Sequence, residues 1–590
     1  MFFFAYLGSP EHESGWRQTL QRHADWLGLS AHAFSRRVAD GRVFAYGWVS
    51  LRPPDTEALV REGGNNLTII PLDTLTRAEA LAQDSPRGFM TNAIRMDVSL
   101  ASGEVWIAVP LLTVEQFYHA VDGRDWVFGN DLRLMLRWAG MDVDERAVYS
   151  FFQYDFVPPP LTISKTVRRV PGGFAFTLPP GGEPSLKRLF DAREIAEPHP
   201  EPASPAERVR AAVDGVLARV PSSPIVHFSG GVDSGLVAAR LAALGRKDPW
   251  LQNYTYGPDD PFRELAPQMA AHLGLQFEQV AWQMSEVPAI LGDMAKEYSF
   301  PVSDPAMIPT VMLARAMDQW GFRPSTLLTG TVASNALEVG PRYAPWRRVF
   351  MIPRPLRWLA SQAYPLGLWR SESAAARAAA VMRRSLQLSL LQAACSPHGN
   401  LLGLAYDIPR GTHAEMKQIL MEGYEAVTEG ATPRDRMVLM GMIRHGTARC
   451  GARPFDAMRR RGIQTVHPFM EPSVLRAAFS LSWEERCEGK ETKALLKRLL
   501  AESVPHEWVY RERAGFPLPF SDVFAHPVVR ALVGDLVLSP RNPVMDLCRR
   551  QNVEQVFRRA EERKPLNVGA RRFVWAFTSL SLWLSQLRYH

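Results

Sequence analysis

A short apolar run followed by a glycine-rich turn, IVHFSGGVDSG at 225–235, constrains this chain more than any other segment. The run at 225–228 is typical of a buried strand, and a helical pattern begins directly after the two glycines. In an open parallel sheet, ligands bind beyond the carboxyl ends of the strands, where backbone N–H groups and a helix N-terminus face outwards. The segment therefore predicts a ligand-binding turn.

The sequence around this turn predicts a chain with both α/β and α+β character. From 206 onwards, short apolar runs alternate with amphipathic stretches (IVHF before SGLVAARLAALG, LQNYTYG before FRELAPQMAAHLG), which favours a parallel sheet wrapped by helices. The later part, from about 371, is mostly helical. Residues 1–190 instead carry short strands such as RVFAYGWVSL and EVWIAVPLL, which favour antiparallel sheets with covering helices. The proline-rich segment at 191–205 is predicted to be a linker.

The composition excludes several classes of protein. A net charge of +7 over 590 residues permits anionic ligands without requiring nucleic acid, and the run RRRG at 459–462 is expected to be a surface cluster. The four cysteines lie far apart without zinc-ligand spacing, which indicates a reduced compartment. The first residues do not resemble a signal peptide, and the apolar stretch at 573–587 is too short to span a membrane. We expect a cytoplasmic protein in which this stretch is a buried helix.

Each residue type in the turn has a chemical reason to be there. Gly230 and Gly231 let a phosphate chain approach the backbone, and Ser229 and Ser234 offer hydroxyl donors. Phosphates would repel Asp233 unless a divalent cation lay between them, so Asp233 is predicted to be a Mg²⁺ ligand. The chain lacks a GxxxxGK[ST] pattern, which favours a cradle for pyrophosphate over γ-phosphate transfer. The competing interpretation is a structural turn in which Asp233 and Ser234 cap the next helix.

The hexapeptide SGGVDS resembles the signature of the ATP pyrophosphatases, the PP-loop group, which activate a carboxylate or carbonyl as an adenylate and release pyrophosphate. Later segments, among them TLLTGTVASNALEVG, VHPFMEPSVLRAAFSL, GKETKALLKRLL and VYRERAGF, resemble the synthetase domain of the asparagine synthetase B family. WVFGNDLRLMLRWAG and the segment after it are similar to the end of that family's glutaminase domain. The resemblance implies an Ntn-type sandwich at 1–190, a PP-loop domain at 206–590, and the cofactors ATP and Mg²⁺.

One residue of the resembled glutaminase is missing. Glutaminases of this type need a cysteine directly after the initiator methionine, because its thiol is the nucleophile. Position 2 is Phe2, and the first cysteine is Cys395. We therefore expect no glutaminase reaction at this N-terminus and an amine supplied by the substrate itself, which leads to ring closure.

Two groups of the superfamily close rings, the β-lactam synthetases and the lasso peptide cyclases. The family's pyrophosphate loop usually ends in Asp-Glu, whereas lasso peptide cyclases often carry Asp-Asn there, and the aligned pair in this chain is Ser334-Asn335. Asn335 therefore favours a lasso peptide cyclase, although Ser334 departs from both forms. Such an enzyme would join the N-terminal amine of a leaderless core peptide to an Asp or Glu side chain. Its expected partners are the core peptide and possible leader-peptidase and leader-recognition proteins, with no nucleic acid and no membrane insertion.

The resemblance also assigns residues. Those expected to bind ATP are Ser229, Gly230, Gly231, Asp233, Ser234, Thr329 and Gly330. Thr331 is expected near the reacting centre, Arg513 in place of the family's catalytic lysine, and Lys493 near the phosphates. Asp233 and Ser334 would hold Mg²⁺, with Asp304, Glu338 or water completing the shell. The simpler interpretation of Lys490, Lys493 and Lys497 is a solvated helix face.

Three other functions stay open at this point. A β-lactam synthetase-like or asparagine synthetase-like ligase would use a small molecule in place of a peptide. A tRNA-modifying ATP pyrophosphatase is disfavoured, because thiolating members need active-site cysteines and the four here are scattered. A degenerate scaffold would bind peptide or nucleotide without chemistry, a reading prompted by Ser334 and Arg513.

Overall fold

The structure is a computed structural model of the whole chain. It describes residues 1–72, 74–82, 92–191, 203–258, 260, 262–320, 324–337, 346, 348–362, 374–387, 415, 418–419, 422, 425–486, 491, 493–511 and 519–588. The predicted linker at 191–205 falls largely outside these residues, and helix α6 (Pro205–Leu217) begins directly after it.

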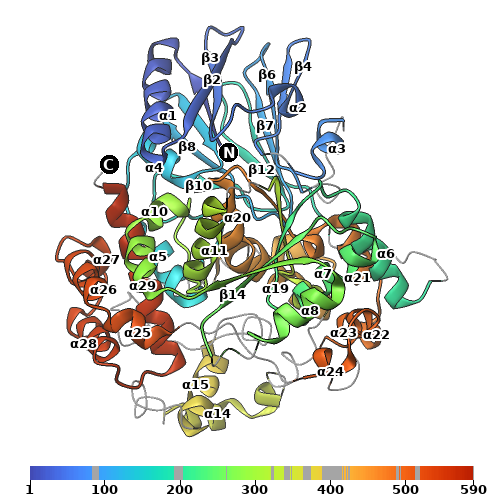
Figure 1. Cartoon of the computed structure of the whole chain (residues 1–590). Helices are drawn as coiled ribbons and strands as arrows, with labels where there is room; N and C mark the ends of the chain where they lie inside the picture. The colour runs from blue at the N-terminus through green and yellow to red at the C-terminus, as the bar shows by residue number, and fades with distance from the viewer. Residues whose placement is uncertain are drawn as a thin grey trace.

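Two antiparallel sheets occupy the part of the chain before residue 190, as the sequence predicts (Figure 1). The first has the order β10-β8-β9-β1-β3-β2, with β1 Phe2–Gly8, β2 Ser30–Arg37, β3 Val43–Ser50, β8 Tyr118–Asp122, β9 Asp125–Gly129 and β10 Arg168–Arg169. The second has the order β12-β11-β7-β6-β5-β4, with β4 Val60–Gly63, β5 Asn66–Ile69, β6 Arg95–Ser99, β7 Val105–Val109, β11 Phe174–Leu178 and β12 Ser185–Arg188.

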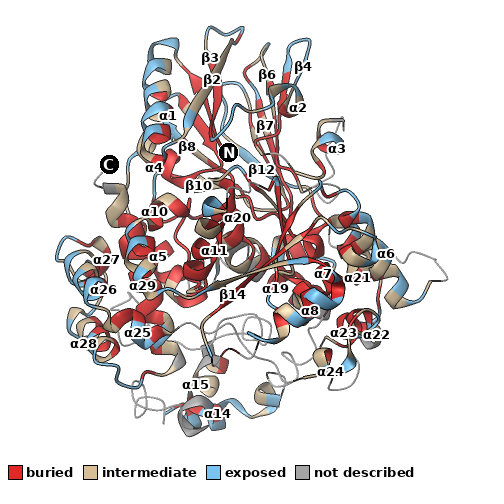
Figure 2. Ribbon diagram, viewed as in Figure 1, coloured by how far each residue is buried: buried red, intermediate tan, exposed pale blue. Residues whose placement is uncertain are grey.

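Strand β1 shows why these sheets form a sandwich. Its sequence FFFAYLG is buried at every position, although side chains of a strand alternate between the two faces of its sheet. Phe3 and Leu7 pack into the core shared with the second sheet. Phe4 packs on the opposite face, against helices α1 (Glu13–Leu27) and α4 (Leu132–Ala139). The middle of the first sheet is therefore covered on both sides: β1 and β3 are buried along their whole length, whereas the edge strand β2 is mostly half-buried (Figure 2).

A parallel sheet follows, as the alternation of runs and helices predicts. Its order is β15-β14-β13-β16-β17, with β13 Ile225–His227, β14 Trp250–Thr255, β15 Gln276–Ala281, β16 Thr326–Thr329 and β17 Gln464–Val466. Strand β13 is central and pairs in parallel with β14 on one side and β16 on the other. The glycine turn therefore leaves the middle of the sheet at its carboxyl edge.

Helices cover both faces of the parallel sheet (Figure 1). Ile225 and Leu327 share a cluster with residues of α11 (Met307–Gln319) and α20 (Ala452–Arg459), whereas Val226 and Leu328 pack with residues of α6 and α7 (Val232–Ala243). Successive residues of one strand thus serve opposite helical layers, which explains the continuous apolar runs.

The other helices have these bounds: α2 Thr56–Leu59, α3 Arg77–Ala82, α5 Glu145–Tyr154, α8 Leu265–Leu273, α9 Val287–Gly292, α10 Met294–Glu297, α12 Ala333–Leu337, α14 Arg354–Ser361, α15 Ala374–Gln387, α19 Pro433–Met442, α21 Pro472–Phe479, α22 Trp483–Arg486, α23 Ala494–Ala501, α24 His506–Val509, α25 Phe520–Ala525, α26 Pro527–Leu532, α27 Pro543–Asp546, α28 Arg550–Glu561 and α29 Val568–Arg588. The apolar stretch at 573–587 lies in α29, where Trp575 and Trp583 are fully buried, so the predicted buried helix is confirmed. Among the described residues, no helix is long and apolar enough to cross a membrane.

Buried arginines join the sandwich to the parallel-sheet part. Arg133 of α4 pairs with Asp131 and donates to the carbonyl oxygens of Ala295 and Lys296 at 2.8 and 2.9 Å. Arg459 is 3% exposed and donates to Asn130. The run RRRG at 459–462 is therefore not the surface cluster that its charge suggests. Arg460 pairs with Glu297 and donates to the carbonyl oxygen of Leu27, and Arg461 pairs with Glu297 and Asp318.

Replacing Arg133 by Met should destabilise this interface strongly. Asp131 is fully buried and would lose its guanidinium, and an uncompensated buried charge costs about 3–5 kcal/mol. Chemical denaturation followed by tryptophan fluorescence should show an earlier transition than in wild type. Arg124, exposed in the β8–β9 turn, provides the matched control, and Arg124→Met should leave the midpoint unchanged. Equal effects of the two substitutions would contradict the assignment.

Candidate functional site

The turn between β13 and α7 depends on its glycines. Gly230 has a φ of 71°, a left-handed conformation that side chains disfavour. A Cβ on Gly230 would also lie 3.3 Å from Cα and Cβ of Ala266 in α8. The backbone of the turn is therefore held close against a neighbouring helix, and the approach of a phosphate chain to Gly230 stays a prediction.

Two serines brace the turn from inside. The backbone N–H of Ser229 donates to Oγ of Ser234 at 3.0 Å, and the two hydroxyls lie 3.1 Å apart. Oγ of Ser229 accepts the N–H of Gly231 at 3.2 Å. Ser234 is buried and its hydroxyl is engaged within the turn, whereas Ser229 is exposed. Both hydroxyls predicted to meet phosphate are therefore engaged within the turn, and Ser229 is the one that lies at an exposed position.

Helix α7 begins without a side-chain cap. Gly231 is its N-cap residue, and it has no side chain that could accept a hydrogen bond from the first turn of the helix. The interpretation that Asp233 and Ser234 merely cap this helix is therefore wrong. The first N–H groups of a helix have no partner within it and carry partial positive charge, so this end of α7 is suited to an anion.

The carboxylate of Asp233 is the centre of the site. Its Oδ2 accepts Nζ of Lys493 at 2.6 Å and Oγ of Ser334 at 2.9 Å. Its Oδ1 is buried and has no hydrogen-bond partner among the described residues. Three segments that are far apart in the sequence thus converge on one carboxylate, with one oxygen left to bind something else.

These groups fit a hard divalent cation with few protein ligands. Mg²⁺ takes oxygen ligands and is commonly held by one or two carboxylates together with substrate phosphates and water. In the described part of the chain, no three His, Cys, Asp or Glu side chains gather as a metal site. Asp233 and the neighbouring Ser334 hydroxyl are thus the protein ligands that a cation would find here. Asp304, predicted as an alternative ligand, instead pairs with Arg453 at 2.7 Å, and Glu338 lies outside the described residues.

Lys493 reaches Asp233 from an unusual backbone. It stands directly before α23 with a φ of 58°, and a non-glycine residue in this region costs about 1–2 kcal/mol. Its side chain is only 13% exposed. Lys497, one turn later, is buried, pairs with Glu491 and lies 5.3 Å from the ring centroid of Tyr510. The solvated-face interpretation is therefore wrong for both lysines, and Lys490 lies outside the described residues.

The loop between β16 and α12 packs directly on the turn. A Cβ on Gly330 would lie 2.5 Å from the backbone nitrogen of Ser234, so only glycine fits. Thr329 is buried; its Oγ1 lies 2.7 Å from Nδ1 of His467 and accepts the N–H of Thr331 at 3.3 Å. Val332 has a φ of 74°, which is rare for a β-branched residue. Such strain clusters at functional sites, and here it follows Thr331, the residue expected near the reacting centre.

Arg511 is a site residue that the sequence analysis missed. Its Nη2 donates to the carbonyl oxygen of Gly230 at 3.3 Å, and its guanidinium lies 4.0 Å from the ring centroid of Phe262. Burial lowers the pKa of Arg511. The segment VYRERAGF contains both Arg511 and Arg513, but the resemblance directed attention to Arg513, which lies outside the described residues.

Fold and site together define an α/β protein in which an antiparallel sandwich precedes a parallel sheet with a glycine turn into an uncapped helix. The family model described as asparagine synthase matches residues 206–585. The chain therefore belongs to the asparagine synthase family.

Two curated relatives give the same picture. The chain is 23% identical over 424 residues to asparagine synthetase [glutamine-hydrolyzing] 1 of Bacillus subtilis, covering 68% of this chain and 63% of that protein. It is 24% identical over 397 residues to a putative asparagine synthetase [glutamine-hydrolyzing] of Mycobacterium tuberculosis, and the alignment covers 64% of this chain and 58% of that protein. The aligned part thus spans less than two thirds of the length of either relative.

Likeness to solved structures is slight. The NH3-dependent NAD synthetase of Campylobacter jejuni matches 25% of this chain and 60% of its own with a TM-score of 0.17 and 18% identity. The glutamine phosphoribosylpyrophosphate amidotransferase of B. subtilis matches 56% of this chain and 82% of its own, with a TM-score of 0.21 and 10% identity.

The contact between the two loops predicts opposite effects for two Gly→Ala substitutions. Gly330→Ala forces a Cβ against the backbone of α7 and should destabilise the protein by about 1–3 kcal/mol, as overpacking does. A Cβ on Gly215 in α6 would meet nothing within 4 Å, so Gly215→Ala should stabilise by roughly 0.4–1 kcal/mol. Thermal unfolding of the two variants measures both, and shifts of the same sign would contradict the packing described.

Proposed function

We propose that this protein is an ATP-dependent, AMP-forming carbon–nitrogen ligase. Membership of the asparagine synthase family supports the reaction class. The observation that carries the proposal is the Asp233 carboxylate, held by Lys493 and Ser334 beside the uncapped end of α7, with one oxygen unpartnered. A triphosphate across the turn would receive backbone N–H groups and two cationic side chains.

The proposed reaction has two steps. A carboxylate oxygen of the substrate attacks the α-phosphorus of ATP, the bond between the α-phosphorus and the bridging oxygen breaks, and pyrophosphate leaves. An amine nitrogen then attacks the acyl carbon of the adenylate, AMP leaves with the former carboxylate oxygen, and the nitrogen loses a proton. The net result is one amide bond and the loss of one water.

Each residue of the site has its own proposed role in the reaction. Asp233 and Ser334 would hold Mg²⁺, which supplies charge neutralisation on the phosphates. Lys493 beside Asp233 and Arg511 beside Gly230 place positive charge at the turn, where pyrophosphate gains negative charge as it leaves. Gly230, Gly231 and Gly330 keep the backbone open to the phosphates, with Ser229 and Thr331 bordering them, while Ser234 and Thr329 brace the two loops. Arg513 stays a candidate for stabilising the transition state.

The source of the amine points to ring closure. The sandwich, which we propose to be related to the Ntn-type glutaminase domain, holds no cysteine, because the first cysteine of the chain is Cys395. At its second position Phe2 is buried, with the Arg459 guanidinium 4.2 Å from its ring centroid. We therefore propose that substrate carboxylate and amine belong to one molecule, and that the enzyme gains mainly by holding them together.

Within this class we propose a lasso peptide cyclase. The residue that favours it is Asn335, which lies in α12, three residues after the strained Val332. The substrate would be a leaderless core peptide whose N-terminal amine forms an isopeptide bond with an Asp or Glu side chain, with leader-peptidase and leader-recognition proteins as partners. The alternative is a small-molecule amide ligase of β-lactam synthetase or asparagine synthetase type.

The products test the proposal. Purified protein incubated with a core peptide, ATP and Mg²⁺ should yield a peptide lighter by one water together with AMP, read by mass spectrometry and nucleotide chromatography. ADP in place of AMP would rule out adenylation. A linear peptide left unchanged while a free amino acid derivative is consumed would favour the small-molecule alternative.

Exchange of labelled pyrophosphate into ATP separates an enzyme from a scaffold. Supplied with the core peptide and Mg²⁺, wild type should catalyse exchange and Asp233→Asn should not, whereas Asp122→Asn at the exposed end of β8 should behave as wild type. No exchange in any of the three would indicate a scaffold without chemistry.

Two lysines, one at the N-cap of α23 and one within it, allow a matched comparison. Lys493→Met removes the cation beside Asp233 and should lower the exchange rate by about 10²–10³-fold, the usual loss for one charge-stabilising group. Lys497→Met keeps a similar stem and removes a cation paired with Glu491, so exchange should stay close to wild type. Equal losses in the two variants would show that α23 matters only for stability.

A further inference from the structure

The four most exposed large apolar side chains of the described residues lie close together in the sequence. They are Met351, Leu356, Trp358 and Leu359, which are 75%, 56%, 57% and 64% exposed. All four lie in α14 or just before it, and Figure 1 shows α14 and α15 at the end of the molecule opposite the sandwich. Single exposed apolar residues are normal on a protein surface, whereas several gathered on one short helix indicate a binding surface.

Helix α14 turns polar side chains inwards and apolar side chains outwards. Arg357 and Ser361 are buried, and Nη1 of Arg357 donates to the carbonyl oxygen of Ser385 in α15 at 2.7 Å. The guanidinium of Arg357 also lies 4.8 Å from the ring centroid of Phe350. An ordinary surface helix has the reverse arrangement, with its apolar stripe towards the core. The packing of the polar face on α15 therefore holds the apolar face of α14 in solvent.

The segment that contains α14 carries the positive charge of the whole chain. Residues 339–406 hold nine arginines and a single acid, Glu372, so their net charge is +8. The whole chain has a net charge of +7, which leaves −1 for all the other residues together. A basic balance that is confined to one segment indicates that this segment meets a partner of negative charge.

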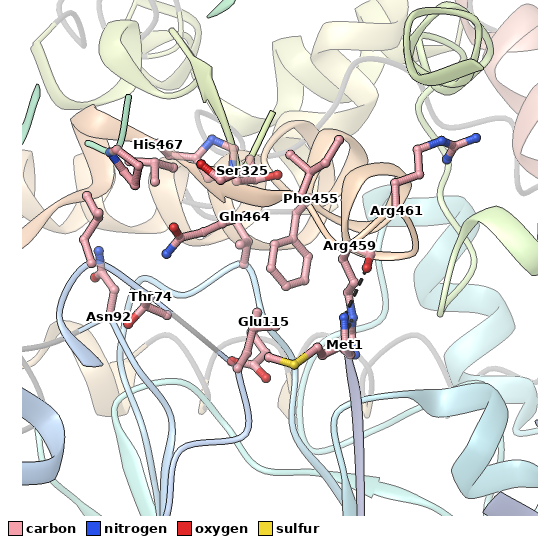
Figure 3. Close-up of a pocket in the computed structure, with 18 of the residues that line it drawn as sticks. Met1, Thr74, Asn92, Glu115, Ser325, Phe455, Arg459, Arg461, Gln464 and His467 are labelled. Atoms are coloured by element: carbon pink, nitrogen blue, oxygen red, sulfur yellow. Dashed lines mark hydrogen bonds between the residues drawn. The ribbon is translucent and has the colours of Figure 1, made fainter. Parts of the chain in front are cut away.

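Arginines that serve the fold are engaged differently. In the run at 459–462, Arg459 is buried and exchanges hydrogen bonds with the backbone of Met1 (Figure 3). Arg348 and Arg354, beside the apolar face of α14, are exposed instead, and neither forms an ion pair with another described residue. Their charge is therefore available to a partner outside the molecule.

An anionic lipid surface matches both features of this face. Amphipathic helices that lie in the membrane interface bury leucine and tryptophan at the boundary between headgroups and acyl chains, with arginine on the polar side. Tryptophan is enriched at that depth. The long apolar stem of arginine lets the guanidinium reach the phosphates while the neighbouring apolar side chains are buried.

Other occupants would use these features less well. A second copy of the chain would bring arginines against arginines, and like charges across an interface are costly. Nucleic acid would attract the arginines but leave the two leucines and Met351 in water. A protein interface of standard size takes about 20–30 residues from each side, whereas α14 has eight residues in all.

We propose that α14 docks this protein on the surface of an anionic membrane. Leu356, Trp358 and Leu359 enter the interfacial region, and Arg348 and Arg354 contact the lipid phosphates. The binding is peripheral and requires no membrane span. It goes beyond the ligase reaction and does not rest on it, because none of these residues belongs to the turn after β13.

Flotation of the full chain with lipid vesicles tests the proposal. Vesicles with about 30% phosphatidylglycerol in phosphatidylcholine should bind at least about tenfold more tightly than vesicles of phosphatidylcholine alone, because each arginine near an anionic surface contributes about fivefold. Raising the salt from about 0.1 M to about 0.5 M should weaken the binding, since it screens these charges. Equal binding to both kinds of vesicle, or binding to neither, would overturn the proposal.

Matched variants locate the docking face. The double substitution Leu356→Asn and Leu359→Asn should weaken vesicle binding about tenfold or more, whereas Leu186→Asn, at an exposed leucine of β12, should not. Arg354→Gln should weaken it about fivefold, and Arg124→Gln in the β8–β9 turn should have no effect. Thermal unfolding checks that each variant is folded, and the lipid and salt dependence of wild type decides the matter if one is not.

A single-stranded oligonucleotide of about 20 nucleotides serves as the competing polyanion. Wild type should bind the anionic vesicles in its presence, and the two leucine substitutions should reduce that binding. Binding to the oligonucleotide without binding to anionic vesicles would identify the segment as a nucleic-acid site and overturn the proposal. Vesicle binding that the leucine substitutions leave unchanged would overturn it as well, since α14 would then not be the docking element.

Discussion

The carboxylate of Asp233 links three segments of the second half of the molecule that lie far apart in the sequence. It receives a lysine from the start of α23 and a hydroxyl from α12, which lie 260 and 101 residues away along the chain. A half-buried carboxylate without these donors would be left uncompensated, and the lysine without it would lose its ion-pair partner. The ion pair therefore fixes the relative positions of α7, α12 and α23, and with them the mouth of the turn.

Buried charge plays a corresponding part where the sandwich meets the parallel sheet. Arg133 and Arg459 satisfy backbone and side-chain oxygens across the boundary, so each half completes the hydrogen bonding of the other. Such contacts contribute little net stability, but a misplaced surface would leave them unpaired. They set one arrangement of the two halves.

Local pattern was enough to predict the elements, but not their long-range contacts. The strand at β13, the turn after it and the buried helix at 573–587 follow from apolar runs and glycines, because short-range sterics decide them. The burial of Arg459 and the approach of Lys493 to Asp233 are decided by partners hundreds of residues away, which periodicity does not reveal. Charge-rich runs such as RRRG and ETKALLKRLL were misread for this reason. Arg511 was overlooked because its neighbour Arg513 matched the motif.

The left-handed backbone at Lys493 carries strain that a glycine would avoid. Lys493→Gly would, however, also remove the only lysine contacting Asp233 among the described residues. The chain thus accepts backbone strain at the start of α23 in return for a positive charge fixed beside the carboxylate. A search for substitutions that raise heat resistance would meet two effects of opposite sign at this one position.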